Sequence, residues 1–220
     1  MHLIWDWNGT LLCDLAIVLE AVNAAIVPLG AAHLTEAGYQ EHYTRPVSMF
    51  YERLLGRPLT ASEWGQIDAD FHLRYTQLLD DAHLADGAEH MLARVAANGQ
   101  SQSLLSMAPH DHLVPLVHAR GIGEFFVRID GSRNERGAGK TASLHAHLEV
   151  LGTDHGVSEV IMVGDAIDDA MAAREVGIDC VLYANGSHRD SQLAATGFPV
   201  VHRLRDAQVL AGNSGRLQFR

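Results

Sequence analysis

Short apolar runs and helix-like stretches alternate from the start of the chain. The first run, Leu3-Ile4-Trp5, is followed by Asp6 and a Gly9-Thr10 turn, and it predicts a short buried strand. Apolar residues then recur at helical spacing from Leu15 to Leu29, and Gly30 is the predicted stop of that helix. The chain therefore opens with one strand and then turns to helices.

The helical pattern continues well beyond this first helix. Two further helical stretches flank Arg45-Pro46, where the proline restricts the backbone. Thr60 and Glu63 have the spacing of a capping box and open a long amphipathic helix. From Asp14 to about Ala85 the pattern predicts helices alone.

After this helical stretch, helices and strands alternate. The predicted strands cover residues 103–105, 125–129, 160–163, 180–183 and 200–201, and the predicted helices cover 88–97, 109–120, 140–151 and 169–176. Such alternation predicts a mainly parallel sheet with helices on both faces. We therefore predict an α/β fold, with a doubly wound, mainly parallel, Rossmann-like core (1–13 and 86–220) and an inserted all-helical domain (14–85).

Composition and charge narrow the class of protein. Of the 220 residues, 47% are hydrophobic and 20% are charged, which is typical of a soluble globular protein. A net charge of −11 argues against binding to nucleic acid or to anionic membranes. The chain shows no secretory signal and no apolar run of about 20 residues, and its two cysteines are far apart. We expect a cytoplasmic protein.

Polar residues stand where several predicted strands end. Asp6 follows the first strand, Ser106 the second and Asp165 the strand at 160–163, while Lys140 begins a helix. Because the carboxyl ends of parallel strands meet at one edge of the sheet, these side chains are expected to share a cleft. Asp169, one turn further on, adds a third carboxylate. Three carboxylates this close repel one another without a cation, and oxygen ligands of this kind suit Mg²⁺.

These residues carry a resemblance to a known family. Asp6-Trp-Asn-Gly-Thr-Leu resembles the opening Asp-x-Asp-Gly-Thr-Leu motif of the haloacid dehalogenase (HAD) superfamily. Leu104-Leu105-Ser106 resembles its second motif, Lys140 in Gly137-Ala-Gly-Lys-Thr its third, and the acidic stretch from Val163 to Asp169 its fourth. The helical insertion after the first strand is similar to the cap domain of one subgroup, and the overall pattern is similar to phosphoglycolate phosphatase.

The resemblance implies a role for each of these residues. Asp6 would be the nucleophile that forms an aspartyl-phosphate. Mg²⁺ would be held by Asp6, by Asp165 and by the backbone carbonyl of Asn8. Ser106 and Lys140 would hold the phosphoryl oxygens of the substrate, a small phosphorylated metabolite. Asp169 would orient Lys140 or a water molecule bound to the metal.

Asn8 departs from the family pattern. Phosphatases of this family have an aspartate two residues after the nucleophile, which protonates the leaving alcohol and then activates water. A carboxamide has no titratable proton near neutral pH, and such acid–base help contributes ~10²–10⁴ in rate. The departure leaves open a phosphatase with another proton donor, a phosphoester-binding or regulatory protein with weak catalysis, and a hydrolase acting on another bond.

The insertion bears on this choice and on the substrate. No lysine occurs between Asp14 and Ala85, which argues against the phosphonate-cleaving members, because they form a Schiff base on a cap lysine. A dehalogenase needs no Mg²⁺, so the full acidic motif argues against that activity as well. Arg45 is the residue of the insertion that suits a substrate carboxylate or a second phosphate. We therefore expect a Mg²⁺-dependent phosphatase of small phosphorylated acids or sugars.

Overall fold

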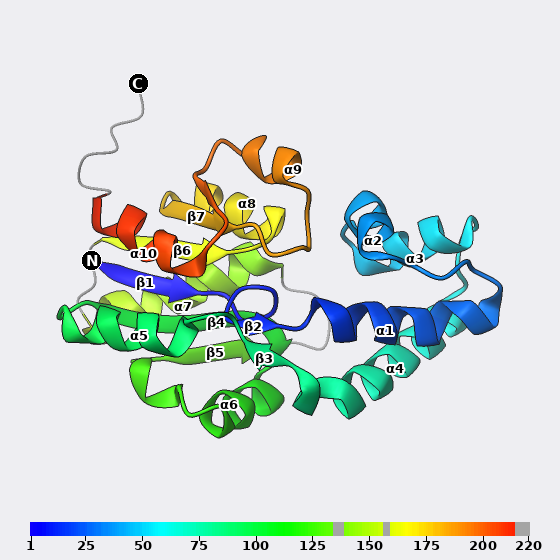
Figure 1. Cartoon of the computed structure of the whole chain (residues 1–220), viewed down its shortest axis with the longest axis horizontal. Coiled ribbons are helices and arrows are strands. Elements are labelled where there is room, and N and C mark those ends of the chain that lie inside the picture. The colour runs from blue at the N-terminus through cyan, green and yellow to red at the C-terminus, as the bar shows by residue number, and fades with distance from the viewer. Residues whose placement is uncertain (134–138, 156–158, 214–220) are drawn as a thin grey trace.

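One parallel sheet organises the structure. The computed structural model describes residues 1–133, 139–155 and 159–213 (Figure 1). The six strands of the sheet lie in the order β5 (Ile129–Ser132), β4 (Ser101–Pro109), β1 (His2–Trp5), β6 (Val160–Gly164), β7 (Asp179–Tyr183) and β8 (Val200–Val201). Every neighbouring pair is parallel. The predicted α/β fold with a parallel sheet is confirmed.

Helices cover both faces of this sheet. The central strand β1 is fully buried, with Leu3 and Trp5 in one core and Ile4 in the other. The Leu3 face packs against α5 (Ala88–Ala97), α6 (His110–Ala119) and α10 (Leu204–Asn213). The Ile4 face packs against α7 (Lys140–His155), α8 (Ile167–Val176) and α9 (Asp190–Ala194). This alternation along β1 is the reason that its apolar run has no polar position.

The helical insertion has a core of its own. It comprises α1 (Leu15–Ile26), α2 (Glu36–His42), α3 (Val47–Leu55) and α4 (Ala61–Leu78), with 3₁₀ turns η1 (Val27–Leu29) and η2 (Leu79–Asp81). Figure 1 shows α1 and α4 packed side by side and extending away from the sheet. The capping box of Thr60 and Glu63 is present, and Gly30 ends the first helical segment at φ 91°. The division into core and cap at residues 14 and 85 stays a prediction.

The two chain segments that join insertion and core are paired. β2 (Leu12–Cys13) and β3 (His83–Leu84) form a short antiparallel ribbon, and the Ala85 amide donates to the Leu11 carbonyl over 2.8 Å. The expectation of helices alone from 14 to 85 is therefore wrong at its end. Two-residue strands are too short to leave a periodic pattern in the sequence.

The predicted strand at 125–129 is also misplaced. Phe125 ends a 3₁₀ turn, η3 (Gly123–Phe125), and the strand β5 begins only at Ile129. Phe125 and Phe126 pack against the core from outside the sheet, so their apolar character reflects burial and not strand pairing. No helix in the described ranges is long and apolar enough to cross a membrane.

Candidate active site

The centre of the sheet positions the first candidate residues. Asp6 directly follows β1, and its amide donates to the Val163 carbonyl of β6 over 2.8 Å. On the other side of β1, Ser106 lies within β4, which runs four residues beyond the predicted strand end at 105. Asp165 follows β6. Three neighbouring strands therefore bring Asp6, Ser106 and Asp165 to one edge, as the sequence predicted.

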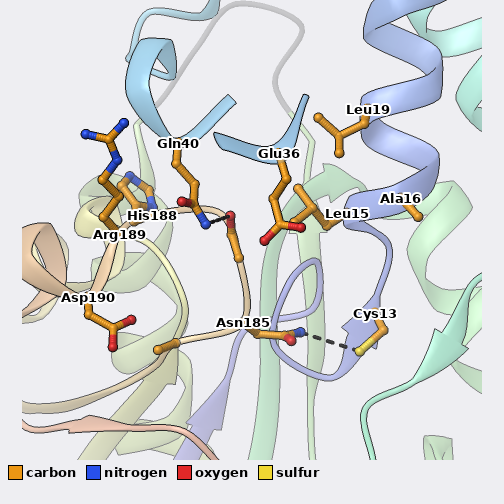
Figure 2. Close-up of a pocket in the computed structure, with 12 residues that line it drawn as sticks. Cys13, Leu15, Ala16, Leu19, Glu36, Gln40, Asn185, His188, Arg189 and Asp190 are labelled. Atoms are coloured by element: carbon orange, nitrogen blue, oxygen red, sulfur yellow. Dashed lines mark hydrogen bonds between the residues drawn. The ribbon is translucent and has the colours of Figure 1, made fainter. Parts of the chain in front are cut away.

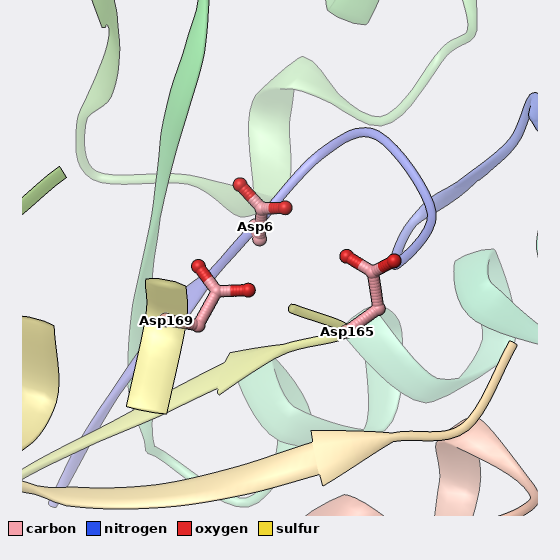
Figure 3. Close-up of side chains that lie close together, drawn as sticks. All are labelled: Asp6, Asp165 and Asp169. Atoms are coloured by element: carbon pink, nitrogen blue, oxygen red, sulfur yellow. The ribbon is translucent and has the colours of Figure 1, made fainter. Parts of the chain in front are cut away.

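Three carboxylates converge at this edge. Asp6, Asp165 and Asp169 each present an oxygen, and these oxygens lie within 4.8 Å of one another (Figure 3). All three residues are buried, with 7%, 4% and 0% of their surface exposed. The Lys140 ammonium, at the start of α7, forms an ion pair with Asp6 and a second with Asp169 Oδ1, at 2.6 Å. Gly137 and Ala138 of the lysine motif lie outside the described residues.

Burial and mutual repulsion set the protonation of this cluster. Burial raises the pKa of Asp6 to about 7, with Asp169 adding to the rise and Lys140 opposing it. Burial, together with the charges of Asp6 and Asp169, also holds the pKa of Asp165 well above its usual range. Burial alone would lower the pKa of Lys140, but Asp169 and Asp6 outweigh it and raise that pKa. Lys140 is therefore a permanent cation facing an excess of carboxylates.

The cluster fits a divalent cation. Three carboxylates meet one ammonium, so the clustered groups carry two uncompensated negative charges when all three carboxylates are ionised. Asp169 Oδ1 has its ion pair with Lys140 but accepts no well-directed hydrogen bond from the described residues. Hard oxygen ligands in a group of this size are the ones that Mg²⁺ takes.

The loop after Asp6 is shaped to lie against Asp165. Gly9 has φ +71°, and a Cβ placed on it would lie 2.2 Å from Asp165 Oδ2. Thr10 Oγ1 donates to Asp165 Oδ1 over 3.4 Å, and the Ser187 hydroxyl donates to the other oxygen. Ser187 was absent from the predicted site. Its position just after β7, at the same edge of the sheet, is the feature of the sequence that could have identified it.

Asn8 lines the same pocket as the carboxylate cluster, and its side-chain nitrogen bonds to Asp14 and Tyr75. Its Nδ2 donates to Asp14 Oδ2 over 2.7 Å and to the Tyr75 hydroxyl over 2.8 Å. Tyr75, on α4, donates its own proton to Asp14 Oδ2 over 2.8 Å. Burial raises the pKa of Asp14, although the hydrogen bonds from Asn8 and Tyr75 act in the opposite direction. The sequence pattern singled out neither Asp14 nor Tyr75 as a site residue.

Arg45 reaches the same pocket from the insertion. A cavity of about 130 Å³ is lined by Asp6, Ser106, Lys140 and Arg45, among others. The Arg45 guanidinium forms an ion pair with Asp168 of α8, and its side chain is 47% exposed. Arg45 therefore lies in the pocket, as expected, but it already has a carboxylate partner from the core.

A larger cavity lies beside this pocket. It has a volume of about 640 Å³ and lies between α1, α2 and the segment after β7 (Figure 2). Gln40 of α2 donates to the Gly186 carbonyl over 3.1 Å, and Asn185 donates to the Gly9 carbonyl over 3.2 Å. These two bonds join the insertion and the loop after Asp6 to the same segment of the core.

A second polar cluster has the residue types of a serine-hydrolase triad. His147 lies 2.6 Å from Asp130 Oδ2 through Nδ1 and 2.7 Å from Ser103 Oγ through Nε2. Ser103 is 0% exposed, and its hydroxyl also meets His2 Nε2 at 2.8 Å. A substrate has no access to this hydroxyl, so the cluster joins β1, β4, β5 and α7 and is not a nucleophile site.

Curated relatives of the chain point in one direction. A phosphoglycolate phosphatase of Pseudomonas fluorescens is 23% identical over 197 residues, which cover 87% of this chain and 72% of that protein. A phosphoglycolate phosphatase of Yersinia pseudotuberculosis is 26% identical over 197 residues, covering 87% of this chain and 84% of that protein. The expected resemblance to phosphoglycolate phosphatases is confirmed.

Solved structures and a family model agree with these relatives. A haloacid dehalogenase-like family hydrolase from Streptococcus pneumoniae superposes with a TM-score of 0.80 at 16% identity, covering 95% of this chain and 97% of its own. A predicted phosphoglycolate phosphatase from Haemophilus somnus has a TM-score of 0.76 at 18% identity, covering 94% of this chain and 96% of its own. The family model for haloacid dehalogenase-like hydrolases matches residues 1–177. The chain belongs to the haloacid dehalogenase-like hydrolases.

Proposed function

We propose that the protein is a Mg²⁺-dependent phosphatase of a small phosphomonoester, with Asp6 as the nucleophile. The observation that carries the proposal is the buried group of Asp6, Asp165 and Asp169 with Lys140 among them, at the carboxyl ends of the central strands. The phosphoglycolate phosphatase relatives support a small phosphorylated acid as the substrate. A cytoplasmic location stays a prediction from the sequence.

The reaction divides into two displacements at phosphorus. Asp6 attacks the phosphorus atom, the bond to the leaving alcohol breaks, and the alcohol oxygen takes up a proton from a water molecule, since the Asn8 amide has none to give. Water then attacks the aspartyl-phosphate, which releases inorganic phosphate and restores Asp6. Ser106 and Lys140 hold the phosphoryl oxygens through both steps, and Asp169 keeps the Lys140 ammonium in place.

The predicted metal ligands are Asp6, Asp165 and the backbone carbonyl of Asn8. When bound, Mg²⁺ would neutralise the repulsion between the carboxylates and the phosphate and stabilise charge on the phosphoryl oxygens. Arg45 is proposed to bind the carboxylate of the substrate in exchange for Asp168, since a bidentate guanidinium–carboxylate pair suits a small phosphorylated acid.

The first experiment measures phosphate release from a panel of small phosphomonoesters, with Mg²⁺ and with EDTA. The wild type is expected to turn over only with Mg²⁺, while Asp6→Asn loses activity by a factor of about 10³ or more. Asp80→Asn, at an exposed aspartate outside the site, is the matched control and retains activity. A wild type that binds phosphate but releases none from any ester would favour the phosphoester-binding alternative.

A further inference from the structure

Asp14 has an unusual relation to its helix. It is the N-cap residue of α1, where an aspartate normally accepts a hydrogen bond from the first turn, but its side chain makes no cap bond. The carboxylate instead accepts bonds from the loop after Asp6. The Gly9 amide donates to Oδ1 over 2.9 Å, and Asn8 donates to Oδ2 over 2.7 Å. Asp14 is 3% exposed, so these hydrogen bonds are buried in the protein interior.

The hydrogen bonds fix the orientation of the Asn8 amide. A carboxylate is only an acceptor, so the atom of Asn8 that lies 2.7 Å from Asp14 Oδ2 is the NH₂ group. The same NH₂ group donates a second hydrogen bond to the Tyr75 hydroxyl over 2.8 Å, and the Tyr75 hydroxyl donates a hydrogen bond to Asp14. Each donor in this group has an acceptor. The side chain at position 8 must donate two hydrogen bonds, and the asparagine amide supplies both N–H donors.

The same geometry disfavours the residue that the family pattern places here. An aspartate at position 8 would set a carboxylate oxygen about 2.7 Å from Asp14 Oδ2, with no proton between the two in their charged forms. The two positions are therefore matched: an amide at one requires a carboxylate at the other.

We propose that Asn8, Asp14 and Tyr75 form a positioning unit that holds the loop after Asp6 against the insertion. Asn8 is in this view a required donor and not merely a lost acid. Tyr75 belongs to α4, so the unit joins a helix of the insertion directly to the segment that carries the nucleophile. Its catalytic consequence rests on the proposed phosphatase function, whereas its structural consequence does not.

The test exchanges the two side chains. In the double variant N8D/D14N, the new amide donates to the new carboxylate and to the Tyr75 hydroxyl, Tyr75 donates to position 8, and Gly9 still finds an oxygen at position 14. The swap therefore keeps the hydrogen bonds among position 8, position 14 and Tyr75 with their directions reversed, and it keeps the bond from Gly9 as it is. N8D alone and D14N alone each create a mismatch. Asn98→Asp, at the exposed asparagine that caps the C-terminus of α5, is the control for the added charge.

Thermal unfolding gives the first readout. N8D and D14N are each expected to lower Tm by about 5 °C or more, and the swap is expected to recover most of the loss. Asn98→Asp should lower Tm by no more than about 2 °C, which is the scale of a negative charge at a helix C-terminus. If the loss of Tm in N8D/D14N equals the sum of the losses in N8D and D14N, the proposed positioning unit is overturned.

Steady-state kinetics with the best ester of the panel gives the second readout. Both single variants and Tyr75→Phe are expected to lose at least 10-fold in kcat with KM nearly unchanged, and the swap is expected to regain kcat. Single variants with wild-type kcat would overturn the positioning role. If no protein of the series, wild type included, hydrolyses an ester, the proposed phosphatase function is wrong. The recovery of Tm in N8D/D14N still tests whether Asn8, Asp14 and Tyr75 form the positioning unit.

Discussion

Metal-free protein is expected to lose stability as the pH rises from 5 to 8. The reason is Asp6, whose pKa burial raises from 3.8 to about 7, with Lys140 opposing the rise and Asp169 adding to it. Because the folded state holds this proton more tightly than the unfolded chain, its contribution to stability is complete below about pH 3.8. That contribution is lost as the pH rises towards 7.

The size of the effect follows from the same values. A rise from 3.8 to about 7 corresponds to roughly 4 kcal/mol over that whole range, at about 1.4 kcal/mol per pH unit, and about 3 kcal/mol of it falls between pH 5 and pH 7. For a chain of this length that is a change in Tm on the order of 10 °C. Asp165, whose pKa is raised by burial and by Asp6, acts in the same direction.

The assay is urea unfolding of the wild type and of Asp6→Asn at pH 5, 6, 7 and 8 in EDTA. The quantity of interest is the difference between the two free energies of unfolding, because the contributions of groups far from Asp6 largely cancel in it. The free energy of unfolding of Asp6→Asn should rise relative to that of the wild type as the pH rises. With millimolar Mg²⁺ the wild type should recover its stability at pH 8, since a ligand of the folded state stabilises it. A difference that stays constant from pH 5 to 8 in EDTA would refute the reasoning.

Three further substitutions probe separate parts of the structure. Gly9→Ala should cost about 2 kcal/mol or more and weaken Mg²⁺ binding by calorimetry, because the new Cβ combines φ +71° with a clash at Asp165; unchanged Mg²⁺ affinity would contradict this. Arg45→Ala should raise KM for a phosphorylated carboxylic acid about 10-fold. Its Tm should change little, since the partly exposed pair with Asp168 contributes at most about 1 kcal/mol. His147→Leu should lower the free energy of unfolding by about 2–4 kcal/mol in urea, since both partners of its buried ring lose a bond; a neutral result would refute that role.

The convergence of the site could be predicted because it follows from topology. Asp6, Ser106 and Asp165 follow or end apolar runs, and parallel strands place such ends at one edge. Lys140 could be placed at the same edge as the first residue of a helix, and the structure gives it ion pairs with two of the carboxylates. These conclusions need only the order of elements and not their packing.

What could not be predicted depends on side-chain directions across distant segments. Tyr75 lies 67 residues from Asn8 and reads in the sequence as one more apolar position of α4. Asp14 stands at the N-cap position of α1, and only the structure shows that its carboxylate turns back to the Gly9 amide. The strand predicted to begin at Phe125 was wrong for a related reason. An apolar run indicates burial, and in the sequence a buried segment outside the sheet has the same pattern as a strand.

These contacts change the meaning of the amide at position 8. Against the family pattern alone it is a missing carboxylate, and the obvious repair is to put the carboxylate back. In the structure a buried carboxylate already lies one hydrogen bond away, at Asp14. The nearby cluster holds three aspartates for one lysine, Lys140, so a further charge at position 8 would add to a site that already has an excess. An inactive Asn8→Asp protein would therefore say nothing about whether a carboxylate at position 8 serves catalysis. Only the exchanged pair places it there with its hydrogen bonds intact.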